Sequence, residues 1–250
     1  MHQATRCVTD SSSARHGRSR LAFALDYPNL DSAKAAASPL ADYVGVLKVG
    51  LELFVKEGPS STNLGIDLGC DVFLDLKLHD IPETVERAVA NACQLGVRYL
   101  TVHASGGPRM LAQAAERVRK EGVELTLLAV TVLTSLDETD LRAVGVNRSP
   151  AEQVLNLARM ATSSGIRGFV CSTAEVGRLR TDLGPSVILV TPGIRPSGPG
   201  SDDQKRVATP SLAIQSGSSL LVVGRPIRDA KDPKAAAAAI EREIAQALGS

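Results

Sequence analysis

Two lysines and two aspartates are the residues of this sequence best suited to chemistry. Asp75 and Lys77 stand two positions apart in the run FLDLKLHD, so both side chains share one face of a β-strand, and Asp80 follows just past its end. Lys48 interrupts a second apolar run, VGVLKV. Carboxylates beside ammonium groups favour the charged forms of both, which makes this group a candidate catalytic site.

The energetic cost of such a group argues for a functional role. Burying these charges is costly unless they are paired, and even a good pair often adds no net stability compared with an apolar replacement. Stability alone therefore explains the group poorly. A buried structural ion-pair cluster remains the alternative at this point.

The elements that must position these residues are short β-rich runs alternating with longer helical patterns. The runs are nearly continuous apolar stretches, as expected for parallel strands covered on both faces by helices. About 230 residues in such units is the usual size of a (β/α)8 barrel. We predict an α/β fold, a single-domain (β/α)8 TIM barrel over residues 21–250, with a doubly wound open sheet as the alternative. The predicted strands are 21–26, 44–49, 71–76, 97–103, 124–132, 166–171, 187–190 and 219–224.

Further candidates follow from the barrel, because its active sites lie on the loops after the carboxyl ends of the strands. After the last strand, Gly224 allows close backbone approach and Arg225 supplies a permanently charged fork that suits a phosphate. A surface arginine beside a turn glycine is the alternative. The Pro- and Gly-rich segment 191–206 predicts a mobile loop rather than a helix.

Composition excludes several classes of protein. The 250 residues hold 28 Lys+Arg against 27 Asp+Glu, with 3% aromatic residues, so no basic stacking surface for nucleic acid is expected. The longest apolar runs are less than half of the roughly 20 residues that span a bilayer, so we expect no membrane partner. Four cysteines without a C-x-x-C pair suit neither a zinc site nor a disulfide framework, which favours a cytoplasmic location.

Several other residues invite a functional interpretation less strongly. Residues 1–20 are rich in Ser and Arg and poor in large apolar residues, so we predict a mobile N-terminal extension. An organelle transit peptide is the alternative, although Asp10 and the lack of an apolar stripe disfavour it. His79, His103 and Cys171 have no partner at metal or triad spacing, and we expect structural roles for them.

The run FLDLKLHDIPET resembles the signature of orotidine 5'-monophosphate decarboxylases at every defining position. Further matches are LAFALD, LKVGLELF, VHASGG, VTVLTS, TPGIRP and VVGRPI, so the resemblance, to the bacterial form of the family, extends over nearly the whole chain after residue 20. It implies a lyase that needs no cofactor and no metal. The implied reaction removes carbon dioxide from orotidine 5'-monophosphate and gives uridine 5'-monophosphate, the last step of de novo pyrimidine biosynthesis.

The resemblance also implies roles for individual residues. Lys77 is then the proton donor to C6 of the pyrimidine, Asp75 lies beside the substrate carboxylate, and Lys48 pairs with Asp75 and touches the ribose. Asp80 and Thr84 reach into the partner subunit's site, which implies a homodimer with shared active sites. The other residues that it assigns to substrate binding are Asp26 for the ribose hydroxyls, Thr134 for the pyrimidine edge (often Ser in the family), Pro192 for the base pocket, and Gln204, Gly224 and Arg225 for the phosphate.

Two other functions stay open beside this one. A magnesium-dependent relative acting on a sugar phosphate shares the Asp-x-Lys-x-x-Asp motif, but it carries an acidic residue where this chain has Lys48, and a hard dication is not ligated beside an ammonium. A catalytically silent phosphate-binding barrel is the second alternative. The complete charged group argues against it, because binding alone does not need two buried lysines.

Overall fold

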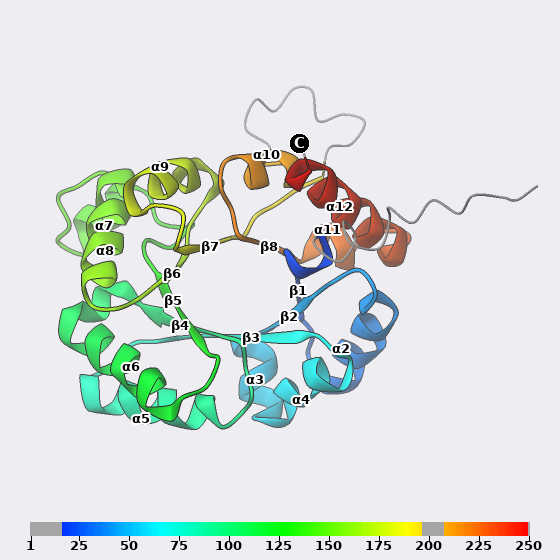
Figure 1. Cartoon of the computed structure of the whole chain (residues 1–250), viewed down its shortest axis with the longest axis horizontal. Helices are drawn as coiled ribbons and strands as arrows, with labels where there is room; N and C mark the ends of the chain where they lie inside the picture. Colours follow the sequence, from blue (N-terminus) through cyan, green and yellow to red (C-terminus); the bar gives the residue numbers. More distant parts are fainter. Residues whose placement is uncertain (1–16, 197–207, 250) are drawn as a thin grey trace, which may run out of the picture.

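The computed structural model describes residues 17–196 and 208–249 and contains a closed barrel of parallel strands (Figure 1). Each strand pairs with the next along the chain, and β8 pairs with β1, with Leu21 opposite Leu221. The predicted barrel is therefore confirmed, and the open sheet is wrong because the first and last strands pair with each other. The strands are β1 (Leu21–Ala24), β2 (Val46–Gly50), β3 (Asp71–Leu78), β4 (Tyr99–His103), β5 (Thr126–Val130), β6 (Gly168–Val170), β7 (Ile188–Thr191) and β8 (Leu220–Val223).

Helices surround the barrel, and their ends follow local sequence signals (Figure 1). Ser149 and Glu152 form a capping box at the start of one helix, and Pro150 takes its first position, where a missing N–H costs nothing. The helices are α2 (Leu30–Ala37), α3 (Leu51–Glu57), α4 (Ser60–Asp67), α5 (Pro82–Cys93), α6 (Gly107–Glu121), α7 (Glu138–Ala143), α8 (Pro150–Ser163), α9 (Thr173–Leu183), α10 (Pro210–Gln215), α11 (Arg225–Arg228) and α12 (Pro233–Leu248), with short 3-10 helices η1 (Ser38–Leu40) and η2 (Ala104–Gly106).

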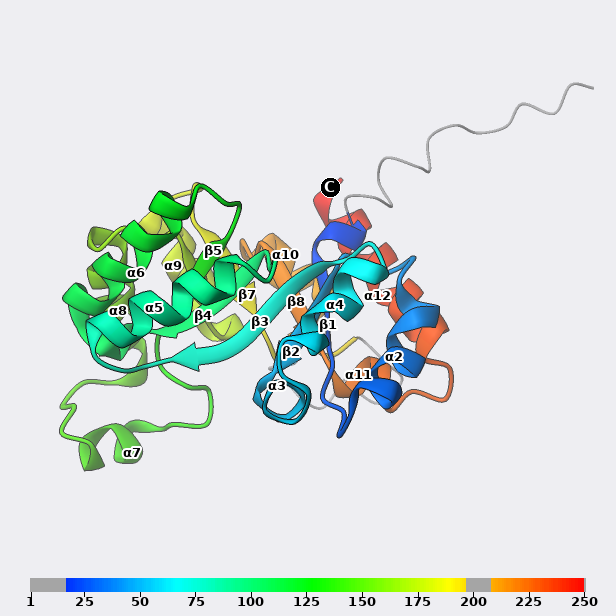
Figure 2. The same cartoon turned by 90° about the horizontal axis from the view of Figure 1, so that it is seen from below.

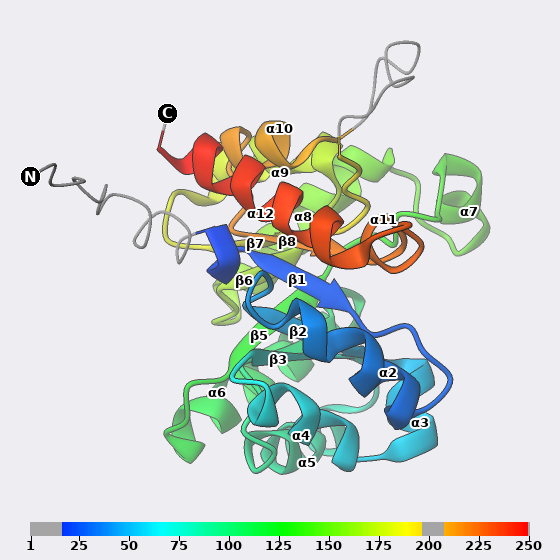
Figure 3. The same ribbon diagram turned by 90° about the vertical axis from the view of Figure 1, so that its right-hand side faces the viewer.

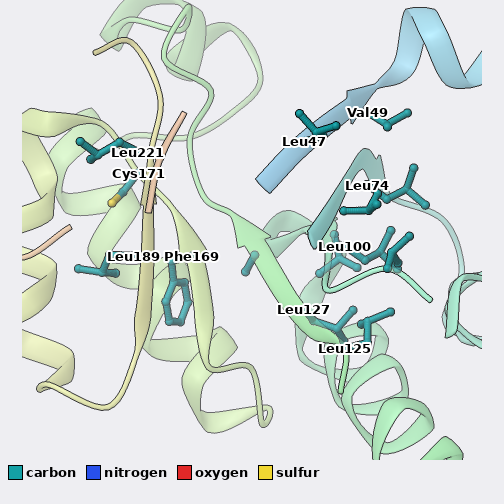
Figure 4. Close-up of a cluster of buried hydrophobic side chains, with 14 of the residues drawn as sticks. Leu47, Val49, Leu74, Leu100, Leu125, Leu127, Phe169, Cys171, Leu189 and Leu221 are labelled. Atoms are coloured by element: carbon teal, nitrogen blue, oxygen red, sulfur yellow. The ribbon is translucent and has the colours of Figure 1, made fainter. Parts of the chain in front are cut away.

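Side chains alternate along each strand between the barrel interior and the core under the helices. Figure 4 shows members of that outer core, among them Leu47, Val49 and Leu74. Lys48 lies between the first two and therefore faces inward, where a smaller apolar cluster that includes Phe73 fills the barrel. The strand period thus selects which residues can reach an active site.

The two ends of the barrel differ in what covers them. In Figure 3 the arrowhead of β1 points to the side where α7 and α11 lie, and α12 ends on the opposite side. Figure 2 shows α7 standing away from the barrel, on the loop after β5. The carboxyl ends of the strands therefore carry the long connections, as expected for the functional end of this fold.

Residues 17–20 precede residue 21, the predicted start of the barrel domain. Residues 17–20 pack against the barrel: the Arg18 side chain donates to the backbone oxygens of Ala41 at 2.9 Å and Gly69 at 3.1 Å, and Arg20 donates to that of Ser219 at 2.9 Å. Composition missed this because both arginines bind backbone carbonyls, whereas the prediction counted only apolar residues. The predicted extension is otherwise residues 1–16, which lie outside the described residues.

Three further features concern membrane spans, metal sites and disulfide bonds, which the sequence composition disfavours. Within the described ranges, no helix has both the length and the apolar character needed to cross a membrane. The same ranges hold no cluster of three or more His, Cys, Asp or Glu side chains able to hold a metal ion. Cys70, Cys93 and Cys171 are buried free thiols.

Replacing Glu241, on α12, with glutamine is expected to stabilise the protein at neutral pH. This side chain is 6% exposed, its Oε1 has no hydrogen-bond partner among the described residues, and burial raises the pKa of its carboxyl. Because the pKa of the Glu241 carboxyl is higher in the folded state than in the unfolded state, its protonated form stabilises the fold at low pH, and this stabilisation is lost as the pH rises through the folded-state pKa. Glu241→Gln should raise Tm at pH 8 by about 2–4 °C, the effect of roughly 1 kcal/mol.

Thermal unfolding of both proteins between pH 4 and 8 tests this expectation. The Tm difference should shrink toward pH 4, where the wild-type carboxyl is protonated in both states. A Tm difference that is constant with pH would contradict it.

Candidate active site

Strand pairing brings the charged residues together at the carboxyl ends of β1, β2 and β3. Lys48 pairs with Phe73 of β3, two residues before Asp75, so the side chains of Lys48 and Asp75 point to the same inward face. Lys77 Nζ lies 2.8 Å from Asp75 Oδ1, and Lys48 Nζ lies 3.7 Å from Asp75 Oδ2. Lys48 Nζ also lies 3.4 Å from Asp26 Oδ1. The result is an alternating charged array, Asp26–Lys48–Asp75–Lys77.

Asp80 is not part of the array within one chain, although the sequence placed it there. The Asp80 carboxylate is exposed and accepts a hydrogen bond from the backbone N–H of Ile81 at 2.6 Å. Asp26 is instead the second aspartate of the array. Spacing along the chain could not predict this, because Asp80 follows the end of β3, where the strand period no longer sets direction.

The backbone of β3 is irregular at the site. Leu74 lies opposite Leu100 and Leu78 opposite Val102, so three residues of β3 face the single Thr101 of β4. Lys77 sits in this bulge at φ 52°, the only positive φ of a non-glycine residue in the described part of the chain. Such strain costs on the order of 1–3 kcal/mol and clusters at functional sites.

Thr101 is a site residue that sequence reasoning missed. It is fully buried, its hydroxyl donates to Asp75 Oδ1 at 3.0 Å, and it accepts a hydrogen bond from the backbone N–H of Lys77 at 2.8 Å. The available signal was a polar residue at an inward position of an apolar strand, between Leu100 and Val102.

The array is shielded from solvent but not sealed from it. The side chains of Lys48 and Asp75 are 13% and 15% exposed, and that of Lys77 is 31% exposed. His103 lies nearby: burial lowers its pKa, and the neighbouring His79 and Lys77 lower it further, which favours the neutral ring. Its ring centroid is 5.4 Å from that of His79.

Two adjoining cavities open from the array. One, of about 280 Å³, is lined by Lys48, Asp75 and Lys77 together with Thr134, Pro192 and apolar side chains. The other, of about 680 Å³, is lined by Lys48, Asp26, Pro192, Gly224 and Arg225, among others. Lys48 and Pro192 border both cavities, so the two are neighbouring parts of one mouth.

The walls of these cavities have distinct chemistry. Arg225 is exposed at the larger one. A Cβ at Gly224 would stand 3.5 Å from Asp26 Oδ2, an ordinary van der Waals contact, so the backbone of Gly224 lies close to Asp26 in this wall. Cys171 lines the smaller cavity, but burial raises the pKa of its thiol to about 12, which removes it as a thiolate nucleophile.

The remaining predicted residues lie elsewhere. Thr84 is exposed on the first turn of α5 and, like Asp80, borders neither cavity. Gln204 lies outside the described residues. A single chain thus gathers Asp26, Lys48, Asp75 and Lys77 with the cavity walls, and leaves Asp80 and Thr84 on its surface.

A closed (β/α)8 barrel with paired lysines and aspartates beside a partly apolar cavity, and an arginine in an adjoining one, defines a barrel enzyme for a small anionic ligand. The family model described as orotidine 5'-phosphate decarboxylase / HUMPS family matches residues 19–240. The chain belongs to this family, as the sequence resemblance indicated.

Individual relatives support the same family. The chain is 51% identical over 221 residues to an orotidine 5'-phosphate decarboxylase of Anaeromyxobacter sp. (strain K), covering 88% of this chain and 96% of that one. It is 50% identical over 226 residues to that of Chromohalobacter salexigens, with 90% and 96% covered. A crystal structure of orotidine 5'-phosphate decarboxylase from Lactobacillus acidophilus superposes with a TM-score of 0.79 at 40% identity, covering 90% and 98%.

Proposed function

We propose that this protein decarboxylates orotidine 5'-monophosphate to uridine 5'-monophosphate without a cofactor, the final step of UMP biosynthesis. The observation that carries the proposal is the Lys77 ammonium held 2.8 Å from Asp75 at the mouth of the barrel. Loss of carbon dioxide from C6 leaves an electron pair in the plane of the pyrimidine ring, where it does not delocalise into a carbonyl. The site must therefore stabilise that charge electrostatically and supply a proton.

Lys77 is suited to both tasks. Its ammonium lies 2.8 Å from Asp75 Oδ1, so a cation that carries a transferable proton is already in place when negative charge develops at C6. Asp75 lies beside the departing carboxylate of the substrate and is itself neutralised on its other oxygen by Lys48. The C6–carboxyl bond breaks, its electrons stay on C6, and a proton from Lys77 Nζ forms the new C6–H bond.

The two cavities divide the substrate between them. Pro192 and Thr134 line the smaller cavity, whose apolar walls suit the pyrimidine. Lys48, at the shared border, and Asp26, in the larger cavity, take the ribose hydroxyls. Arg225 in the larger cavity binds the phosphate as a planar charged fork. The family resemblance assigns Gln204, which lies outside the described residues, to the same phosphate.

The position of Lys48 argues against a magnesium-dependent reaction. Its ammonium lies 3.4 Å from Asp26 and 3.7 Å from Asp75, where a divalent cation would need those carboxylates as ligands. A divalent cation bound to these carboxylates would lie close to the Lys48 ammonium, and two positive charges repel strongly in a partly buried site.

The active enzyme is a homodimer in the cytoplasm, and each site takes Asp80 and Thr84 from the partner. Both side chains are exposed and lie away from the cavities of their own chain. Ile81, between them in sequence, is 62% exposed, so an apolar side chain lies on the same surface segment and is available to a partner subunit. Three buried free thiols, Cys70, Cys93 and Cys171, suit a reducing compartment.

Mixing two inactive variants tests the shared site. Lys77→Ala and Asp80→Ala should each be inactive alone, but a mixed dimer has one site with neither change. Equal mixing with subunit exchange should restore about a quarter of wild-type activity, since half of the dimers are mixed and each has one intact site. Exchange without recovered activity would mean that Asp80 acts within its own chain.

The function itself is tested by adding orotidine 5'-monophosphate to the protein in the presence of EDTA and following the ultraviolet change from orotate to uracil. We expect rapid conversion that resists the chelator. No conversion of orotidine 5'-monophosphate, together with turnover of a sugar phosphate when magnesium is added, would favour the metal-dependent relative. Nucleotide binding without turnover would favour the silent binder.

A further inference from the structure

Thr101 occupies a fully buried position in the wall of the barrel, under the charged array. It pairs with Leu128 of β5, a member of the interior cluster, so its side chain points inward. It borders neither of the two cavities that open from the array. Thr101 therefore cannot act on a substrate directly, and any role must pass through the residues that it contacts.

Its hydroxyl contacts two groups of the array, one as a hydrogen-bond donor and the other as an acceptor. It donates to Asp75 Oδ1 at 3.0 Å and accepts from the backbone N–H of Lys77 at 2.8 Å. One oxygen atom thus joins the carboxylate that holds the proton donor to the backbone from which that donor extends.

The acceptor half of this contact compensates for the irregular strand. Because three residues of β3 face Thr101 alone, the regular ladder is interrupted at Lys77, and its N–H needs another acceptor. The hydroxyl supplies one while Lys77 is held at φ 52°. A strained residue persists only where its surroundings enforce it.

The donor half sets the orientation of the carboxylate. Asp75 Oδ1 receives both the Thr101 hydroxyl and the Lys77 ammonium, and Oδ2 faces Lys48 at 3.7 Å. The hydroxyl therefore fixes the plane of the carboxylate so that each oxygen faces one lysine. Without it, the carboxylate is free to rotate toward either lysine.

We propose that Thr101 is a positioning residue for the decarboxylation, holding Asp75 and Lys77 in the geometry in which the ammonium meets C6. The inference rests on the proposed function. Its physical basis is preorganisation: a charged site contributes most when its groups need not reorient as charge develops.

Thr101→Val tests the proposal, because valine keeps the shape and removes the hydroxyl. A hydrogen bond to a charged group is worth about 1.5–3 kcal/mol, so kcat should fall by about 10- to 100-fold. KM for orotidine 5'-monophosphate and Kd for uridine 5'-monophosphate should change by less than about threefold, since Thr101 touches neither cavity. Thr101→Ser, which keeps the hydroxyl, should restore kcat to within about threefold.

Thr62→Val is the matched control. Thr62 in α4 is also fully buried, and its hydroxyl donates to the backbone oxygen of Pro59 at 2.8 Å, remote from the array. It should lose stability as Thr101→Val does and keep kcat per folded molecule. If Thr101→Val does not fold, Thr101→Cys, with a weaker donor of similar size, replaces it and should show the same loss of kcat.

Wild-type kcat per folded molecule in Thr101→Val, or in the cysteine variant if it is the one that folds, would overturn the proposal. So would an equal loss in Thr62→Val. A crystal structure of the variant separates this failure from that of the proposed function: the Lys77 Nζ–Asp75 Oδ1 contact should lengthen beyond hydrogen-bond distance whether or not the wild type decarboxylates the nucleotide. An unchanged contact would also overturn the inference.

Discussion

Lys77→Ala is expected to lower kcat for orotidine 5'-monophosphate by about 10⁴-fold, the upper range for loss of a positioned proton donor. The change removes the proton for C6 and also leaves Asp75 facing the substrate carboxylate with only Lys48, 3.7 Å away, as its lysine partner. Both effects act on the transition state. Binding of uridine 5'-monophosphate, which lacks the departing carboxylate, should change much less.

Single-turnover conversion followed by ultraviolet absorbance measures this loss. Lys120→Ala is the control, because Lys120 is an exposed lysine that also has a carboxylate partner, Glu116 at 3.9 Å, on the outer helix α6. It should leave kcat unchanged. A Lys77→Ala enzyme with more than about a tenth of wild-type kcat would remove Lys77 from the role of proton donor.

Removing the phosphate from the substrate is expected to lower kcat/KM by orders of magnitude, although the phosphate lies far from the bond that breaks. Contacts to a remote group of the substrate contribute binding energy that can be used to lower the barrier at the reacting centre. Arg225→Ala should therefore lower kcat/KM for orotidine 5'-monophosphate by about 10²-fold, the value of a charge-assisted contact. The same variant should leave kcat/KM for orotidine, which has no phosphate, nearly unchanged.

Steady-state kinetics of both proteins with both substrates form a cycle that isolates the contact. Arg98→Ala is the matched control, since Arg98 immediately precedes β4 at the opposite end of the barrel and pairs with Glu124 at 2.7 Å. It should behave as wild type with either substrate. An Arg225→Ala variant that loses equally on orotidine would show that Arg225 does not act through the phosphate.

The fold could be predicted because strand and helix patterns are local. Every predicted strand is present, from Leu21–Ala24 to Leu220–Val223, with ends that differ by a few residues. Buried parallel strands appear in a sequence as short apolar runs, and helices show their own period between them. The contacts of Arg18 and Arg20 with the barrel could not be predicted in this way, since they are hydrogen bonds to backbone carbonyls distant in sequence.

The candidate site was only partly accessible to the same reasoning. The strand period predicted that Asp75 and Lys77 share a face, and the structure places them 2.8 Å apart. The two residues are separated by a bulge in β3, where Lys77 has φ 52°, and the regular strand period does not describe such a bulge. Asp26 joined the array in place of Asp80 because β1 lies beside β2 in the closed sheet.

The amino-acid sequence by itself determined the family, the barrel and three of the four residues of the charged array, Lys48, Asp75 and Lys77. These depend on residue types and local spacing, which can be read directly from the linear sequence. Only the tertiary structure decided which charges meet, that Thr101 supports them, and that Asp80 and Thr84 face away from their own chain's cavities. Those facts depend on strand register and closure of the sheet, which join residues far apart in the chain, so local spacing does not show which groups are in contact.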